Sequence, residues 1–78
     1  MQDLSQMHPG DRGRVKELTA MGSMRRRFLD MGLIEDTLVE CLGKSPLGDP
    51  SAYRVRGAVI AIRARDGRTV LMKEERLC

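Results

Sequence analysis

The hydrophobic residues of this chain fall into short groups, and turn-forming residues separate the groups. Glycine, proline and aspartate recur between them, and no uninterrupted apolar run is longer than 58–62. Short apolar segments punctuated by turns are typical of a compact, mostly β domain. We expect about five strands, near residues 13–18, 37–42, 53–56, 58–62 and 69–73.

The side-chain pattern differs between these segments. Residues 53–56 alternate apolar side chains with arginines, as in a strand with one buried face. Residues 37–42 are so continuously apolar that we expect no solvent-exposed face there. In the next strand, Ala58, Ile60 and Ile62 are predicted to line one side.

A different periodicity predicts one short helix, from about Ser23 to Met31. Met24, Phe28 and Met31 recur at the i, i+4, i+7 spacing of a helical stripe, and Leu29 widens that stripe. The charged residues between them would then face water.

Both ends of this helix carry local signals. Ser23 is a candidate N-cap, since its hydroxyl can accept a hydrogen bond from the first turn. Gly32 follows the last periodic residue, where a left-handed cap favours glycine. Leu33 is then expected to pack back on Phe28.

Two dipeptides predict turns. Pro9-Gly10 suits the centre of a type II turn before the first strand. Asp66-Gly67 suits a hairpin between the last two strands.

These elements together predict a mostly β fold, a small SH3-like β-barrel of about five strands with one inserted short helix. Open sheet edges invite association, so a sheet this small is expected to curl closed. The 78 residues have room for a single domain, 1–78.

Charge and composition exclude few classes of binding partner. The formal net charge is +3, and arginine carries most of the positive charge. That balance is compatible with nucleic acid, anionic headgroups or an acidic protein face. The first ten residues have no basic cluster followed by an apolar core, and no run approaches the roughly 20 residues that cross a bilayer. We expect a soluble, cytoplasmic protein without direct membrane insertion.

Residues that carry chemistry are sparse. His8 is the single histidine, and the adjacent pairs Glu35-Asp36 and Glu74-Glu75 point their carboxylates apart. Cys41 lies in an apolar run and is expected to be a buried thiol, and Cys78 a free terminal one. The sequence therefore predicts a binding protein and not an enzyme, with no catalytic residue, no metal site and no cofactor.

Two segments are candidate partner-binding sites. The first is a loop whose two prolines reduce its freedom, and its residues are Pro46, Leu47, Gly48, Asp49 and Pro50. Its leucine is either a knob for a partner groove or a side chain tucked under its own loop. The second is Arg25 and Arg26 on the predicted helix, for which the solvated face of a helix is the favoured explanation.

Nucleic-acid binding is the main alternative, because SH3-like barrels often bind RNA. Recognition of single strands relies on aromatic stacking. The chain has one Phe and one Tyr and no Trp, and the predicted helix already uses Phe28. This composition argues against nucleic acid.

The order and spacing of several motifs resemble the FeoA family. The most specific are Arg27-Phe28-Leu29-Asp30-Met31-Gly32-Leu33 and Pro46-Leu47-Gly48-Asp49-Pro50, with Pro9-Gly10 and Ile60-Ala61-Ile62-Arg63 in support. The resemblance implies an SH3-like barrel with an inserted helix. It also implies a cytosolic accessory protein of ferrous iron uptake that binds the membrane transporter FeoB. The alternatives are a small RNA- or ribosome-associated barrel and a free-standing peptide-binding module.

Two positions depart from the family pattern. The family often has Pro-Gly where this chain has Glu35-Asp36, although aspartate tolerates unusual turn angles. The family also has a short helical turn where this chain has Asp66-Gly67-Arg68. A helical turn there is therefore an alternative to the hairpin. The sequence does not indicate whether the chain self-associates.

Overall fold

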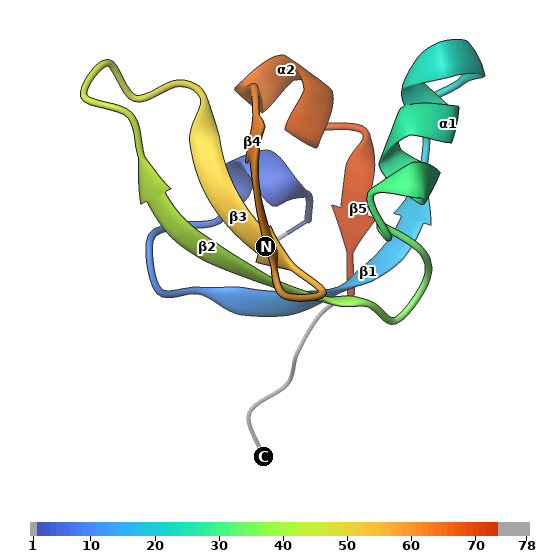
Figure 1. Cartoon of the computed structure of the whole chain (residues 1–78), viewed down its shortest axis with the longest axis horizontal. Helices are drawn as coiled ribbons and strands as arrows, with labels where there is room; N and C mark the ends of the chain where they lie inside the picture. The colour runs from blue at the N-terminus through green and yellow to red at the C-terminus, as the bar shows by residue number, and fades with distance from the viewer. Residues whose placement is uncertain (1, 74–78) are drawn as a thin grey trace.

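The structure is a computed structural model and describes residues 2–73 of the chain. A 3-10 helix, five strands and two helices follow one another along the chain (Figure 1). They are η1 (Leu4–Gln6), β1 (Arg12–Leu18), α1 (Gly22–Asp30), β2 (Leu38–Lys44), β3 (Ser51–Val55), β4 (Ala58–Ile62), α2 (Ala64–Gly67) and β5 (Val70–Met72). The fold is mostly β, as predicted.

The five strands form one antiparallel sheet in the order β4-β3-β2-β1-β5. Irregularities in β1, between Val15 and Glu17, and in β2, between Cys41 and Gly43, bend it. Strands β4 and β5 do not pair, so the prediction of a closed barrel is wrong. They are joined by α2 instead, and the edge of β5 bridges to Asp3.

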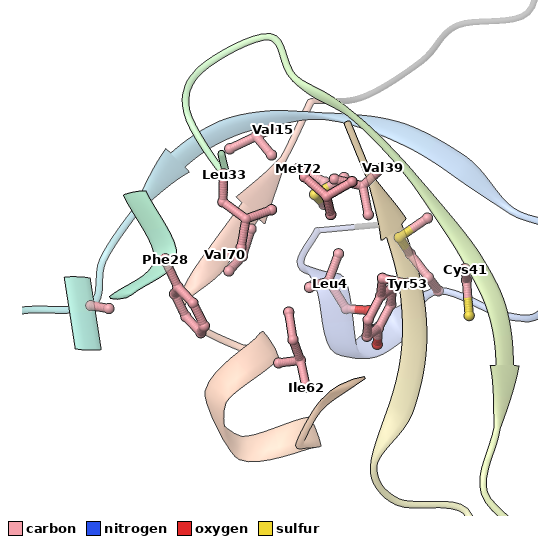
Figure 2. Close-up of a cluster of buried hydrophobic side chains, with 13 residues drawn as sticks. Leu4, Val15, Phe28, Leu33, Val39, Cys41, Tyr53, Ile62, Val70 and Met72 are labelled. Atoms are coloured by element: carbon pink, nitrogen blue, oxygen red, sulfur yellow. The ribbon is translucent and has the colours of Figure 1, made fainter. Parts of the chain in front are cut away.

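The core lies on the inner face of this curled sheet (Figure 2). Leu4 and Met7 enter it from the N-terminal segment, and both are fully buried. The hydroxyl of Tyr53 donates to the carbonyl oxygen of Leu4, 3.2 Å away, which ties that segment to β3. Burial raises the pKa of this hydroxyl, so it remains a neutral donor.

The predicted end of α1 is confirmed. Gly32 adopts φ +95°, and its N–H donates to the carbonyl oxygen of Leu29 at 3.0 Å. The N–H of Leu33 donates to the carbonyl oxygen of Phe28, also at 3.0 Å. These two bonds form a Schellman motif, and the fully buried Leu33 completes it.

The predicted start of α1 is wrong. Met21 occupies the N-cap position and makes no side-chain cap hydrogen bond. The helix begins at Gly22, so Ser23 lies inside the first turn, not before it. Leu29 is also misassigned, because it is 40% exposed. Only a narrow stripe of α1 reaches the core, with Phe28 buried and its two methionine neighbours packed beside it.

Two strands are more exposed than the sequence suggests. In β2, Val39 and Cys41 are buried, but Leu38 is 44% exposed. The expectation that this strand has no solvent-exposed face is wrong, because no helix or strand within residues 2–73 covers the outer face of the sheet. In β4, Ile62 is buried and Ile60 is partly buried, whereas Ala58 lies exposed at the strand end.

The hairpin turn is not at Asp66-Gly67. These residues belong to α2, and the N–H of Gly67 donates to the carbonyl oxygen of Arg63 at 2.8 Å. The helical turn implied by the family resemblance is therefore confirmed. A two-residue hairpin forms instead at Arg56-Gly57, where φ is 51° and 82°. Positive φ at both positions is the geometry of a turn that matches strand twist.

Replacing Phe28 with alanine should destabilise the protein by about 3–5 kcal/mol, since its ring is 2% exposed and closes one side of the core. Urea denaturation followed by circular dichroism measures this change. The exposed Arg26→Ala on the same helix is the matched control and should leave the midpoint within experimental error. An unchanged midpoint for Phe28→Ala would contradict the burial of the ring.

Gly32→Ala should cost about 1–2 kcal/mol, because alanine is strained at positive φ. An added Cβ would also lie 2.7 Å from Cδ of Arg56. Gly43→Ala is the control, since its φ is not left-handed and nothing lies within 4 Å of the added atom. Equal unfolding free energies for the two variants would show that the helix cap does not require glycine at position 32.

Candidate functional site

The loop between β2 and β3 is held by its own backbone. The N–H of Gly48 donates to the carbonyl oxygen of Ser45 at 2.7 Å, and the N–H of Ser45 donates to that of Pro50 at 3.1 Å. Gly48 adopts φ +86°, and the Asp49–Pro50 peptide bond is cis. The two hydrogen bonds give the predicted loop a defined shape, and β2 extends to Lys44 at its start.

Leu47 projects from the tip of this loop. Its side chain is 94% exposed, the largest exposure among the large hydrophobic residues described. Of the two arrangements that the sequence allows, the structure shows the exposed one. A side chain that packs on nothing contributes little to the folded state, so Leu47 is available to a partner.

Asp49 has a structural contact that sequence patterns do not reveal. Its Oδ1 accepts the N–H of Ala64 at 2.8 Å. Ala64 is the first residue of α2, so this carboxylate caps the start of that helix and ties the loop to it. The contact joins residues 15 positions apart, and only the folded chain brings them together.

Arg25 and Arg26 both lie exposed on α1. Arg25 donates from Nη1 to the carbonyl oxygen of Leu18 at 3.2 Å, which fixes its position beside the end of β1. The loop carrying Leu47, α2 and the first turns of α1 share one end of the molecule (Figure 1). The two predicted segments are thus at the same end, with α2 between them.

The outer face of the sheet holds a groove that the sequence analysis missed. Its volume is about 440 Å³, and its lining includes Arg14, Leu38, Glu40 and Arg54. Glu40 lies 3.9 Å from the guanidinium of Arg12 and 3.8 Å from that of Arg54, across three adjacent strands. The sequence signal for this groove was Glu40, a charged residue within the otherwise apolar run 37–42 for which we expected no solvent-exposed face.

An ion pair beside this groove joins two distant segments. Nζ of Lys73 lies 2.7 Å from Oδ1 of Asp36. The contact lowers the pKa of the Asp36 carboxyl and raises the pKa of the Lys73 ammonium. Both groups are solvent-exposed, so the pair positions the turn before β2 more than it stabilises the fold.

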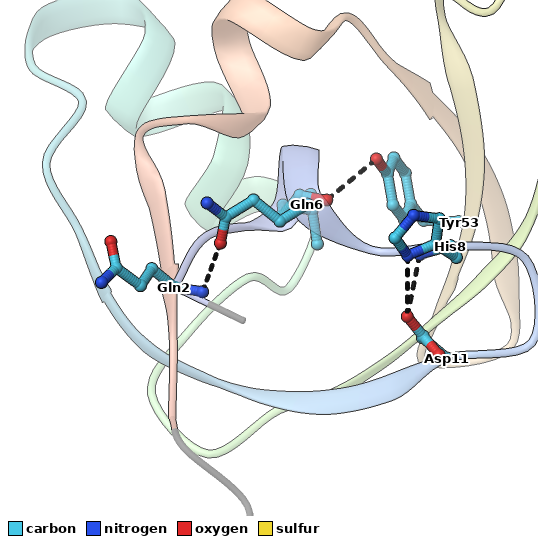
Figure 3. Close-up of polar contacts among 6 residues, drawn as sticks. Gln2, Gln6, His8, Asp11 and Tyr53 are labelled. Atoms are coloured by element: carbon cyan, nitrogen blue, oxygen red, sulfur yellow. Dashed lines mark hydrogen bonds and ion pairs between the residues drawn. The ribbon is translucent and has the colours of Figure 1, made fainter.

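The histidine and the described cysteine lie in different surroundings. His8 is 79% exposed in the Pro9-Gly10 turn, with Nδ1 3.7 Å from Oδ2 of Asp11 (Figure 3). Cys41 is buried, and burial raises the pKa of its thiol, which makes it a poor nucleophile. Among residues 2–73, no three His, Cys, Asp or Glu side chains are grouped so as to hold a metal ion. Cys78 lies outside the described residues.

The two aromatic residues of the chain are both in the core. Phe28 and Tyr53 are each 2% exposed. Neither ring can stack on a nucleic-acid base without unfolding part of the domain. No helix in the described part of the chain is long and apolar enough to cross a membrane.

Comparisons with known proteins place these features in a family. Residues 2–74 match the FeoA domain. A fusion protein of Fe(2+) transport protein A and the Fe(2+) transporter FeoB from Porphyromonas gingivalis is 30% identical over 63 residues. That match covers 81% of this chain but only 8% of the fusion protein.

Solved structures share the architecture. FeoA from Chlorobium tepidum is 30% identical, with a TM-score of 0.83 over 90% of this chain and 67% of its own. FeoA from Stenotrophomonas maltophilia, a procaryotic SH3 domain protein complexed with zinc, is 19% identical with a TM-score of 0.83. That likeness covers 94% of this chain and 91% of the other, and it concerns the fold alone.

The SH3-like fold predicted from the sequence is therefore confirmed, with a sheet that remains open between β4 and β5. FeoA proteins are an accessory family linked to ferrous iron transport, and they are not a known class of enzyme. With its family match spanning almost the whole chain, this protein belongs to the FeoA family.

Proposed function

We propose that this protein is a cytosolic accessory protein that acts by binding a FeoB-type ferrous iron transporter. The observation that carries the proposal is the relative in which FeoA and FeoB are fused in one chain. Fusion holds the two parts at a high effective concentration, which favours contact between them. The matched region is 8% of that fusion protein, so the transport itself belongs to the remainder.

Leu47 is the proposed centre of the contact. A fully exposed leucine on a hydrogen-bonded loop loses little conformational freedom when it enters a partner groove. Binding energy in protein interfaces concentrates in a few such anchors, surrounded by residues that exclude water. The N–H of Gly48 and the carbonyl oxygen of Pro50 take part in the hydrogen bonds of the loop, and the ring of Pro46 fixes its own φ.

Arg25 and Arg26 form the proposed second contact. They lie at the same end of the molecule as the loop and carry positive charge into solvent. Exposed charges at the rim of an interface raise the association rate more than they raise affinity. An acidic surface on the transporter would be attracted to this end first, before Leu47 docks.

Leu47→Asp should weaken binding to the detergent-solubilised transporter by about thirtyfold or more, the loss expected for a hot spot of about 2 kcal/mol. The melting temperature should stay near that of the wild type, because the side chain packs on nothing. Biolayer interferometry with immobilised transporter measures the affinity. Leu38→Asp is the matched control: Leu38 is a 44% exposed apolar residue on the outer face of β2, away from the loop end, and its replacement should not affect binding.

Two results would contradict this assignment. Unchanged affinity for Leu47→Asp would exclude the loop tip as the anchor. A large drop in its melting temperature would show that Leu47 supports the fold and not the interface.

Asp49→Ala should also weaken binding, although Leu47 itself is intact. The substitution removes the acceptor for the Ala64 N–H and should cost about 0.5–2 kcal/mol of stability. It also frees the loop from α2, so more entropy is lost on docking. Asp49→Asn retains the Oδ1 acceptor and should restore both stability and affinity. If the alanine variant binds as tightly as the asparagine variant, the order of the loop does not contribute to binding.

A further inference from the structure

The two edges of the sheet differ in their backbone pairing. The outer edge of β5 is covered by the N-terminal segment: Asp3 forms a bridge with Leu71, and the N–H of Met72 donates to the carbonyl oxygen of Gln2 at 2.9 Å. Strand β4 pairs with β3 on one side only. Within residues 2–73, β4 therefore provides the edge that has no backbone partner, and side chains of α1 and α2, including Met24, Arg27 and Asp66, line a small pocket with Ala61 beside it.

The register of the hairpin shows which backbone groups of β4 are unpaired. Val55 and Ala58 flank the two-residue turn, so they form a hydrogen-bonded pair, and pairs alternate from there along the strands. Ile60 therefore bonds to β3, whereas the N–H and C=O groups of Val59 and Ala61 point away from it. In the described part of the chain, these groups have no backbone partner in a loop or turn.

The side chains along this edge do not protect it. Natural edge strands usually carry a lysine, a proline or a bulge that prevents pairing with another chain. Residues 58–62 contain no charge and no proline, and β3 and β4 pair without a register shift. Val59 is 62% exposed, and Ala61 is exposed beside it. An apolar strand with free N–H and C=O groups is a template for another strand.

We propose that β4 pairs in antiparallel fashion with β4 of a second copy of this chain, about a two-fold axis at Ile60. This axis places Val59 of one copy opposite Ala61 of the other, and in each such pair the N–H of each residue donates to the carbonyl oxygen of the other. The free donors and acceptors of one copy thus match those of the other. The two sheets become one continuous sheet across the axis.

The sequence around β4 favours a second copy as the occupant. An isologous interface needs a patch that is complementary to itself, and an uncharged strand meets no repulsion from its own copy. In this register, Arg63 lies opposite Gly57 of the other copy, so no arginine directly faces another across the axis. Ile60 faces Ile60 on the inner side, where this residue already packs against the core.

The interface is short, so the association is weak. Small interfaces correspond to transient complexes, and self-association should be detectable at roughly 10 μM to 1 mM. Sedimentation velocity of the full chain over this range should show a reversible monomer–dimer equilibrium. Leu47→Asp should dimerise like the wild type, because Leu47 lies on the loop between β2 and β3. That result separates this proposal from the transporter contact.

Ala61→Pro is the decisive variant. Proline at this position removes a donor that points away from β3, so the hairpin keeps its own hydrogen bonds. The variant should remain a monomer at the highest concentration, and Val59→Pro should behave in the same way. Val59→Thr keeps the donor and a β-branched side chain, and it should dimerise. Circular dichroism establishes that each variant is folded.

Amide hydrogen exchange gives a second measurement that needs no variant. The amides of Val59 and Ala61 should exchange more slowly as the wild-type concentration rises, while that of the loop residue Leu47 should not change. A monomer throughout the range, with concentration-independent exchange at both amides, would overturn the proposal. A dimer that both proline variants retain would also overturn it, because the contact would then lie elsewhere.

Discussion

The fold depends on covering the open side of one curled sheet. Five short strands supply the inner face, but they do not enclose it. Leu4 from the N-terminal segment and Phe28 and Leu33 from α1 and its cap fill the remaining space, and each is at most 2% exposed. A chain of 78 residues has little apolar surface to spare, so each of these residues contributes a large share of the core. The Schellman motif matters for this reason, since it turns the chain so that Phe28 and Leu33 both reach the core.

Because the core uses these apolar residues, the apolar side chains that remain exposed are available for binding. The core is complete without the side chains of Leu47 and Val59, and both side chains are exposed. The proposed transporter contact and the proposed self-contact therefore use different parts of the molecule. Leu47 lies on a loop held by Asp49, and Val59 lies on the edge strand β4. Both contacts are binding surfaces, in agreement with an accessory family that is not a known class of enzyme.

Several features that depend only on neighbouring residues were predicted correctly from the sequence. The helical stripe, the left-handed glycine at Gly32 and the turn at Pro9-Gly10 depend on neighbouring residues, and all three are present. The hairpin at Asp66-Gly67 was wrong because this segment must connect two strands that do not pair. The open edge of β4 and the cap of α2 by Asp49 depend on contacts between distant segments, so no spacing in the sequence could indicate them. The candidate loop was visible from its prolines, but the exposure of its leucine was not.

We propose that this protein acts by docking its loop end on the transporter. The most direct test is to titrate the isotope-labelled chain with detergent-solubilised FeoB-type transporter and to follow the amide resonances by NMR. Our account predicts line broadening concentrated at residues 45–50, with a weaker effect at Arg25 and Arg26. Broadening confined to the outer groove around Leu38 and Glu40, or none at a saturating concentration of transporter, would contradict it.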